Sequence, residues 1–135
     1  MTERAVVDAS AMVDLLVGST AGDAVRHRLR QHELHAPGHF DAEILSALGR
    51  LHRAGMLPAD AVTARVEQVA AAPIQRHELA PLLVGAWGLR DRLRLVDALY
   101  VELASRLRAP LVTTDAGLAA AASVAELVEG PRGAR

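Results

Sequence analysis

The feature that most constrains the fold of this chain is an alternation between short apolar runs and longer segments with helical periodicity. Apolar runs lie at residues 5–7 and 111–114, and three further short segments, at 34–36, 74–77 and 124–128, also have the length of strands. Each run is too short for a helix but long enough for a buried strand. Because strands that alternate with helices usually pair in parallel, we expect an α/β fold. It would be a three-layer α/β/α sandwich around a mainly parallel sheet of about five short strands.

The segments between these runs have the apolar spacing of amphipathic helices. Phe40, Ile44 and Leu48, for example, recur every four residues and would share one face of a helix over 40–53. Further helices are predicted after residue 9, from a cap at Asp23 to about residue 31, and over 58–72, 79–89, 96–107 and 117–122. This interpretation assigns Trp87 to the core.

Composition limits the number of domains and the classes of active site that the chain can form. The 135 residues fit a single domain over 1–135, with 129–135 as a frayed tail. All 15 basic residues are arginines, and cysteine is absent. Phosphate-binding loops and Schiff-base enzymes need a lysine, while disulfides and thiolate metal sites need cysteines, so these classes are excluded. The aromatic share of 2% argues against modules that stack successive bases.

Charge and hydropathy limit the kinds of partner that we expect for this chain. No apolar run approaches the roughly 20 residues that cross a bilayer, and residues 1–4 lead into a strand instead of a signal-peptide core, so we expect a cytoplasmic protein without membrane contact. The net charge of −1 means that RNA binding would depend on local arginines. Arg90, Arg92 and Arg94 are candidates, although a solvated surface explains them equally well.

Acidic residues stand where an open parallel sheet binds its ligands. Asp8 and Asp115 each follow an apolar run, and the carboxyl ends of parallel strands converge on one edge of the sheet. Asp97 and Glu43 lie early in predicted helices and can project toward the same edge. Taken one at a time, each acid fits a helix cap or a first-turn residue at least as well.

A cluster of four acids would require a cation. Two carboxylates about 4 Å apart repel each other by on the order of 4 kcal/mol at an effective dielectric constant of about 20. Hard oxygen ligands without cysteine favour Mg²⁺, with Mn²⁺ as an alternative, and such an ion can activate water for phosphodiester hydrolysis.

Four motifs, in order, resemble those of PIN-domain ribonucleases, and specifically the VapC toxins of bacterial type II toxin–antitoxin systems. The first is Val6-Val7-Asp8-Ala9-Ser10-Ala11, the second joins Pro37 to Glu43 and Leu48, the third is Val96-Asp97-Ala98-Leu99-Tyr100-Val101, and the fourth is Leu111-Val112-Thr113-Thr114-Asp115. Two positions depart from the family pattern: Val96 replaces an aromatic residue, and Ser46 stands where many relatives carry asparagine.

The resemblance implies a PIN fold, a site and partners. Asp8, Glu43, Asp97 and Asp115 would be the catalytic, metal-binding residues, and Ser10 and Thr114 would add hydroxyl support, unless Ser10 is only a helix cap and Thr114 an ordinary strand residue. The expected activity is endoribonucleolytic cleavage by a metal-activated water, giving 5′-phosphate and 3′-hydroxyl ends. A homodimer and a small VapB-like antitoxin are also implied, with operator DNA bound only through the antitoxin.

Two rival functions remain open from the sequence. A catalytically silent PIN-like module would bind a protein or RNA, and the loss of an acid would favour it, but no acid is missing. A Mg²⁺-dependent phosphatase acting on small molecules would share the metal chemistry. It would lack the Asp-x-Asp nucleophile pair and the lysine that such enzymes use.

Overall fold

The computed structural model of the chain describes residues 2–131, which contain one five-stranded sheet. Its strands are β1 (Glu3–Val7), β2 (His32–Pro37), β3 (Ile74–His77), β4 (Leu111–Thr113) and β5 (Ala125–Leu127). They lie in the order β3-β2-β1-β4-β5, and every neighbouring pair is parallel. The predicted α/β class is therefore confirmed.

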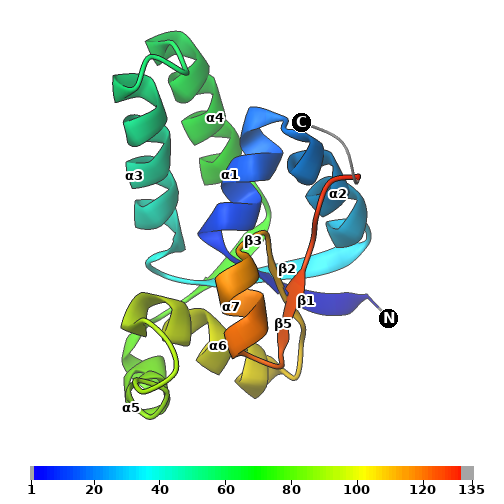
Figure 1. The fold of residues 1–135 in the computed structure, drawn as a ribbon, viewed down its shortest axis with the longest axis vertical. Coiled ribbons are helices and arrows are strands. Elements are labelled where there is room, and N and C mark those ends of the chain that lie inside the picture. Colours follow the sequence, from blue (N-terminus) through cyan, green and yellow to red (C-terminus); the bar gives the residue numbers. More distant parts are fainter. Residues whose placement is uncertain (1, 132–135) are drawn as a thin grey trace.

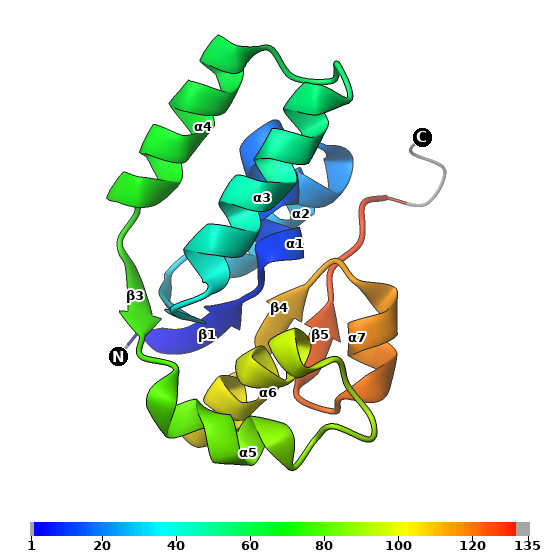
Figure 2. The ribbon, with the colours of Figure 1, turned by 90° about the vertical axis from the view of Figure 1, so that its left-hand side faces the viewer.

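Helices cover both faces of this sheet (Figures 1 and 2). The elements are α1 (Ala9–Val17), α2 (Thr20–Leu29), α3 (Phe40–Arg53), α4 (Ala59–Ala71), the 3-10 helix η1 (Ala80–Leu82), α5 (Leu83–Trp87), α6 (Leu95–Leu107) and α7 (Ala116–Ala121). Figure 2 shows α1 to α4 above the sheet and α5 and α6 below it, with α7 beside β5. This is the predicted three-layer arrangement.

The core lies against the central strand β1. Ala5, Val6 and Val7 are fully buried because β2 and β4 flank the strand and helices pack on both faces. Phe40 from α3 and Tyr100 from α6 are the bulkiest buried side chains. The last three residues of the strand are therefore apolar, and Asp8 is the first polar residue beyond its carboxyl end.

The second helix begins earlier than the sequence indicated. Its N-cap is Ser19, whose hydroxyl accepts a hydrogen bond from the Gly22 backbone N–H at 3.0 Å, and the helix ends at Leu29 instead of about 31. Asp23 lies inside the first turn, so its assignment as the cap was wrong. Gly18, with φ of 77°, ends α1 in the left-handed conformation and brings the chain round to Ser19.

The predicted helix over 79–89 is broken into η1 and α5, and Trp87 is not a core residue. Leu82 and Ala86 turn inward, which leaves Trp87 on the outer side with 57% of its surface exposed. The guanidinium of Arg90 covers its ring at 4.7 Å from the centroid. Within residues 2–131, no helix is both long enough and apolar enough to cross a membrane.

The chain end was predicted as a frayed tail over 129–135. Residues 129–131 follow β5 without helix or strand, and 132–135 lie outside the described residues.

Candidate active site

Asp8 is the most deeply buried acid of the site, with 4% of its surface exposed. It follows β1 directly and caps α1, where its Oδ1 accepts hydrogen bonds from the Ala11 backbone N–H at 2.9 Å and the Ser10 hydroxyl at 2.8 Å. The Thr113 hydroxyl donates to Oδ2 at 2.6 Å. The cap of this helix is thus Asp8 and not Ser10, and the carboxylate is held from both sides.

The electrostatic environment of Asp8 favours its protonated form. Burial raises the pKa of this carboxyl from 3.8 to about 6, although the three hydrogen bonds oppose that rise. The nearby charge of Asp115 adds a smaller upward contribution. A cation bound beside Asp8 would reverse this effect, because opposite charge stabilises the ionised form.

Asp115 stands at the carboxyl end of β4, one strand away from Asp8. It caps α7, and its Oδ1 accepts from the backbone N–H groups of Gly117 at 2.9 Å and Leu118 at 3.2 Å. Its own N–H donates to the Thr113 hydroxyl oxygen at 3.0 Å. Thr113 therefore bridges the two acids, and its orientation follows from the pairing of β1 with β4.

Glu43 reaches the site from the first turn of α3. Its Oε1 accepts a hydrogen bond of 2.6 Å from the hydroxyl of the buried Tyr100 on α6, and His39 Nε2 lies 3.5 Å from the same oxygen. Burial and the carboxylate together raise the pKa of Tyr100 far above its usual range, so the phenol stays protonated and remains a donor. This contact joins the helices on opposite faces of the sheet.

Asp97 lies in the first turn of α6 and is paired with an arginine of the same helix end. Arg94 Nε lies 3.0 Å from Asp97 Oδ2, and Arg94 Nη2 lies 3.4 Å from Oδ1. The carboxylate raises the pKa of the guanidinium, which therefore remains charged. Among the four acids, as far as residues 2–131 show, Asp97 alone is paired with an arginine.

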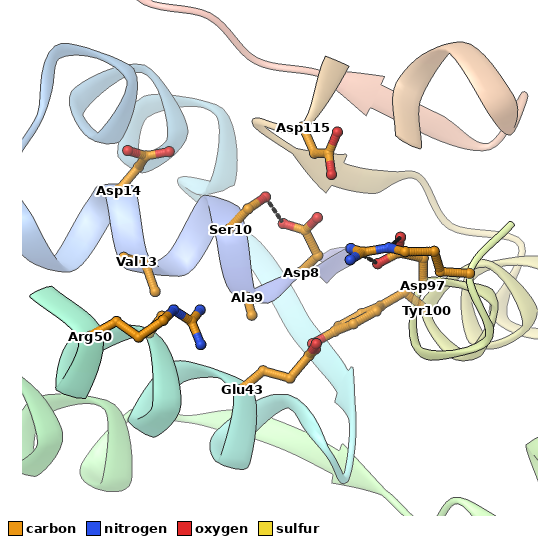
Figure 3. Close-up of a pocket in the computed structure, with 12 residues that line it drawn as sticks. Asp8, Ala9, Ser10, Val13, Asp14, Glu43, Arg50, Asp97, Tyr100 and Asp115 are labelled. Atoms are coloured by element: carbon orange, nitrogen blue, oxygen red, sulfur yellow. Dashed lines mark hydrogen bonds and ion pairs between the residues drawn. The ribbon is translucent and has the colours of Figure 1, made fainter. Parts of the chain in front are cut away.

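One cavity of about 390 Å³ brings these side chains together. All four predicted acids line it, with Ser10, Asp14, Arg50, Arg94 and Tyr100 on its walls. Figure 3 shows Asp8 in the middle, Glu43 below it on α3, Asp97 to its right and Asp115 above it. The cavity opens at the carboxyl edge of the sheet, where a parallel α/β fold binds its ligands.

Comparison with known proteins now identifies the family. The model of the PIN domain matches residues 5–124, and the ribonuclease VapC3 of Mycobacterium tuberculosis is 57% identical over 120 residues, which cover 88% of either chain. This chain is a PIN-domain protein of the VapC type. The fold agrees with the crystal structure of PAE2754 from Pyrobaculum aerophilum, at a TM-score of 0.68 and 26% identity over 93% of this chain and 83% of the other.

A second solved structure shares the PIN fold. It is a chain from a toxin–antitoxin complex of Klebsiella pneumoniae, with a TM-score of 0.65 and 14% identity over 94% of this chain and 99% of the other.

The donor set of this PIN domain suits a hard divalent cation. The cavity offers carboxylate and hydroxyl oxygens, the ligands that Mg²⁺ and Mn²⁺ prefer. In their present orientation, however, no three acidic or histidine side chains within the described residues lie close enough together to hold a metal ion. Arg94 holds Asp97, and Tyr100 holds Glu43. Metal binding would therefore require these side chains to reorient.

The remaining predicted residues divide between the cavity and its surroundings. Thr114 donates to Asp14 Oδ2 at 2.7 Å, and within residues 2–131 its hydroxyl makes no hydrogen bond to any of the four acids. Arg90 covers Trp87, whereas Arg92 lines a neighbouring cavity that also includes Arg94, Asp97 and Asp115. Arg94 alone of the three arginines lines the acidic cavity.

Four residues of the cavity region were missed: Thr113, Tyr100, Asp14 and Arg50. Helical spacing could have found three of them, because Arg50 lies seven residues after Glu43, Tyr100 three after Asp97, and Asp14 four after Ser10. Such positions share a helix face with the predicted site residue. Thr113 carried no comparable signal.

Proposed function

We propose that this PIN-domain protein is a Mg²⁺-dependent endoribonuclease, with Mn²⁺ as an alternative ion, and the toxin of a type II toxin–antitoxin module. The observation that carries the proposal is the convergence of Asp8, Glu43, Asp97 and Asp115 on one cavity at the carboxyl edge of the sheet. The name of the M. tuberculosis relative, a ribonuclease, supports the same class of reaction.

The side chains of the cavity have separate roles in this mechanism. A bound Mg²⁺ would supply positive charge and lower the pKa of a water molecule for attack on the phosphodiester. Asp8 and Asp97 would be its principal ligands, with Glu43 and Asp115 completing the site. Ser10 and Thr113 fix the orientation of the Asp8 carboxylate, and Tyr100 fixes that of Glu43.

The proposed chemistry also implies a class of substrate and the ends of its products. The acids repel an RNA backbone unless a cation intervenes, so cleavage of single-stranded or looped RNA would depend on the metal. In-line attack by water on phosphorus, with the 3′ oxygen as leaving group, gives a 5′-phosphate and a 3′-hydroxyl. The proposed substrate would be met in the cytoplasm, the location predicted from the sequence.

We further propose the partners that the VapC family implies. A small VapB-like antitoxin would insert a basic side chain into the acidic cavity and compete there with metal and RNA. The toxin–antitoxin complex that shares this fold supports such a partner. The toxin would form a homodimer, and operator DNA would be bound by the antitoxin alone.

Cleavage of bulk host RNA by the purified chain tests the enzymatic proposal. We expect cleavage with Mg²⁺ or Mn²⁺, none in EDTA, and recovery when metal is restored. Asp8→Asn and Asp97→Asn should abolish cleavage while keeping the native circular dichroism spectrum. Activity that persists in EDTA would refute the metal mechanism. Absence of cleavage by the native chain in every metal would favour the silent binding module.

A further inference from the structure

Arg94 combines two properties that the ribonuclease mechanism leaves unexplained. It is the N-cap residue of α6, and its side chain is 74% exposed, yet it binds Asp97, whose side chain is only 17% exposed. It also lines both cavities on the two sides of Asp97. A solvent-exposed cation is thus paired with an acid that lines the reaction cavity.

The four acids differ in the groups that donate hydrogen bonds to their carboxylates. Asp8 and Asp115 accept hydrogen bonds from N–H and hydroxyl groups that carry no net charge, and the Glu43 oxygen accepts from the Tyr100 phenol. Both oxygens of Asp97 face a guanidinium instead. A divalent cation that binds Asp97 must therefore displace a positive charge from it, which the other Asp residues of the cavity do not require.

The position of Arg94 makes that displacement feasible. Exposed ion pairs between residues three apart on a helix are weak, and no core contact has to break when an exposed side chain turns away. The displaced guanidinium stays at the mouth of the cavity, where its planar donors can bind an RNA phosphate in bidentate fashion.

We propose, on the basis of the metal-dependent function above, that Arg94 is a displaceable counter-ion of Asp97 that becomes a phosphate ligand when a divalent cation binds. In the free protein Arg94 neutralises Asp97 and so reduces repulsion in the cavity. Once the cation takes Asp97, the same guanidinium is released toward the RNA. Arg94 is thereby a positioning residue for the metal and a binding residue for the substrate.

A purely structural ion pair makes a different prediction. The helix dipole already favours an acid in the first turn of a helix, so Asp97 does not need Arg94 as a partner. If Arg94 only stabilised this helix end and stayed paired when metal binds, its removal would lower the stability of the fold and would change metal affinity no more than the removal of Arg92. A displaceable counter-ion instead opposes metal binding and assists RNA binding. Its removal must shift the two affinities in opposite directions.

The first measurement is the affinity of the intact protein for Mn²⁺, by electron paramagnetic resonance at low salt, in Arg94→Gln and in a charge-matched control. Arg92→Gln serves as the control: Arg92 borders the second cavity, but within the described residues no ion pair joins it to an acid. We expect Arg94→Gln to bind Mn²⁺ about threefold more tightly than Arg92→Gln, the typical value of an exposed ion pair.

The second measurement is the affinity for a single-stranded oligonucleotide, with Ca²⁺ and then with EDTA. With Ca²⁺, Arg94→Gln should bind more weakly, and the slope of log affinity against log salt should fall by about one. In EDTA the variant should behave as the native chain, because Arg94 is then held by Asp97. Arg94→Lys should restore the salt slope with Ca²⁺.

The outcomes separate this inference from the proposed function. If the two glutamine variants bind Mn²⁺ equally while the native chain still binds it, the counter-ion role is refuted and the metal mechanism stands. If Arg94→Gln weakens RNA binding equally in Ca²⁺ and EDTA, displacement is refuted. If neither the native chain nor any variant binds Mn²⁺, both proposals fail.

Discussion

Asp8→Asn is the substitution whose effect on stability can be derived most directly from the structure. The Asp8 carboxyl is buried, and its pKa in the folded chain is about 6 instead of 3.8. Between these two pH values the folded chain holds more protons than the unfolded chain. The free energy of unfolding must therefore fall as pH rises from about 4 to about 6, and the loss is complete above that window.

The size of this effect follows from the pKa difference. A rise from 3.8 to about 6 corresponds to about 3 kcal/mol of stability lost when Asp8 ionises in its folded position. Asparagine cannot ionise, so the variant escapes this cost. Asparagine is also a good N-cap, because its side-chain oxygen can still accept the hydrogen bond from the Ala11 N–H. Its NH2 group, however, would replace the oxygen that accepts from the Thr113 hydroxyl, so that hydroxyl would have to accept instead of donate, at a pH-independent cost of about 1 kcal/mol.

Urea denaturation at a series of pH values in EDTA measures the prediction. The difference in unfolding free energy between Asp8→Asn and the native chain should grow in favour of the variant from pH 4 to pH 7, by about 3 kcal/mol. Asp91→Asn, in the exposed loop before α6, is the control for the loss of one negative charge. Mg²⁺ should stabilise the native chain more than Asp8→Asn, because it binds the ionised cavity.

A difference that does not change with pH would refute this reasoning. It would show that Asp8 is ionised at little cost in the folded chain, so that its role is confined to capping α1. A variant that is strongly destabilised at every pH would lead to the same conclusion.

Three further predictions follow from single contacts and from the proposed function. Gly22→Ala should lower the free energy of unfolding by on the order of 3 kcal/mol in urea titrations, because its Cβ would lie 1.9 Å from the Asp14 carbonyl oxygen. Gly49→Ala is the control: its Cβ would meet only the Arg53 guanidinium, at 3.5 Å, so this variant should raise the free energy of unfolding by up to about 1 kcal/mol. Tyr100→Phe should reduce RNA cleavage by about tenfold while the chain stays folded, since Glu43 loses its donor at 2.6 Å; unchanged rates would contradict the positioning of Glu43 by Tyr100. Expression of the chain alone should arrest growth of a bacterial host, and coexpression of the antitoxin should relieve it; normal growth together with inactive purified protein would contradict the toxin proposal.

Sequence patterns were sufficient to predict a parallel sheet of short strands and the positions of two of the acids. The apolar runs at 5–7 and 111–114 became the inner strands β1 and β4 within two residues of the predicted bounds, because strands buried on both faces need continuous apolar sequence. The mixed segment at 74–77 became the edge strand β3. Asp8 and Asp115 ended up where such strands stop. Family motifs connected them with Glu43 and Asp97, which spacing alone could not bring together.

Exposure and helix ends were decided by tertiary packing. The apolar character of Trp87 favours a core position, but in the continuous turn from the 3-10 helix η1 into α5 it is Leu82 and Ala86 that are buried, and Trp87 is exposed. Asp23 and Ser19 both had capping side chains, and the turn at Gly18 selected Ser19. Local propensity allowed each alternative, and the surrounding contacts chose one.

Which threonine donates a hydrogen bond to the buried Asp8 depends on the register of β1 and β4. Thr113 and Thr114 are indistinguishable as sequence, but side chains alternate between the two faces of a strand, so a shift of one residue exchanges their roles. The pairing of Val7 with Val112 makes Thr113 the neighbour of Asp8, and Thr114 contacts Asp14 instead. That register pairs strands whose residues lie about a hundred positions apart in the chain, so it leaves no local trace in the sequence.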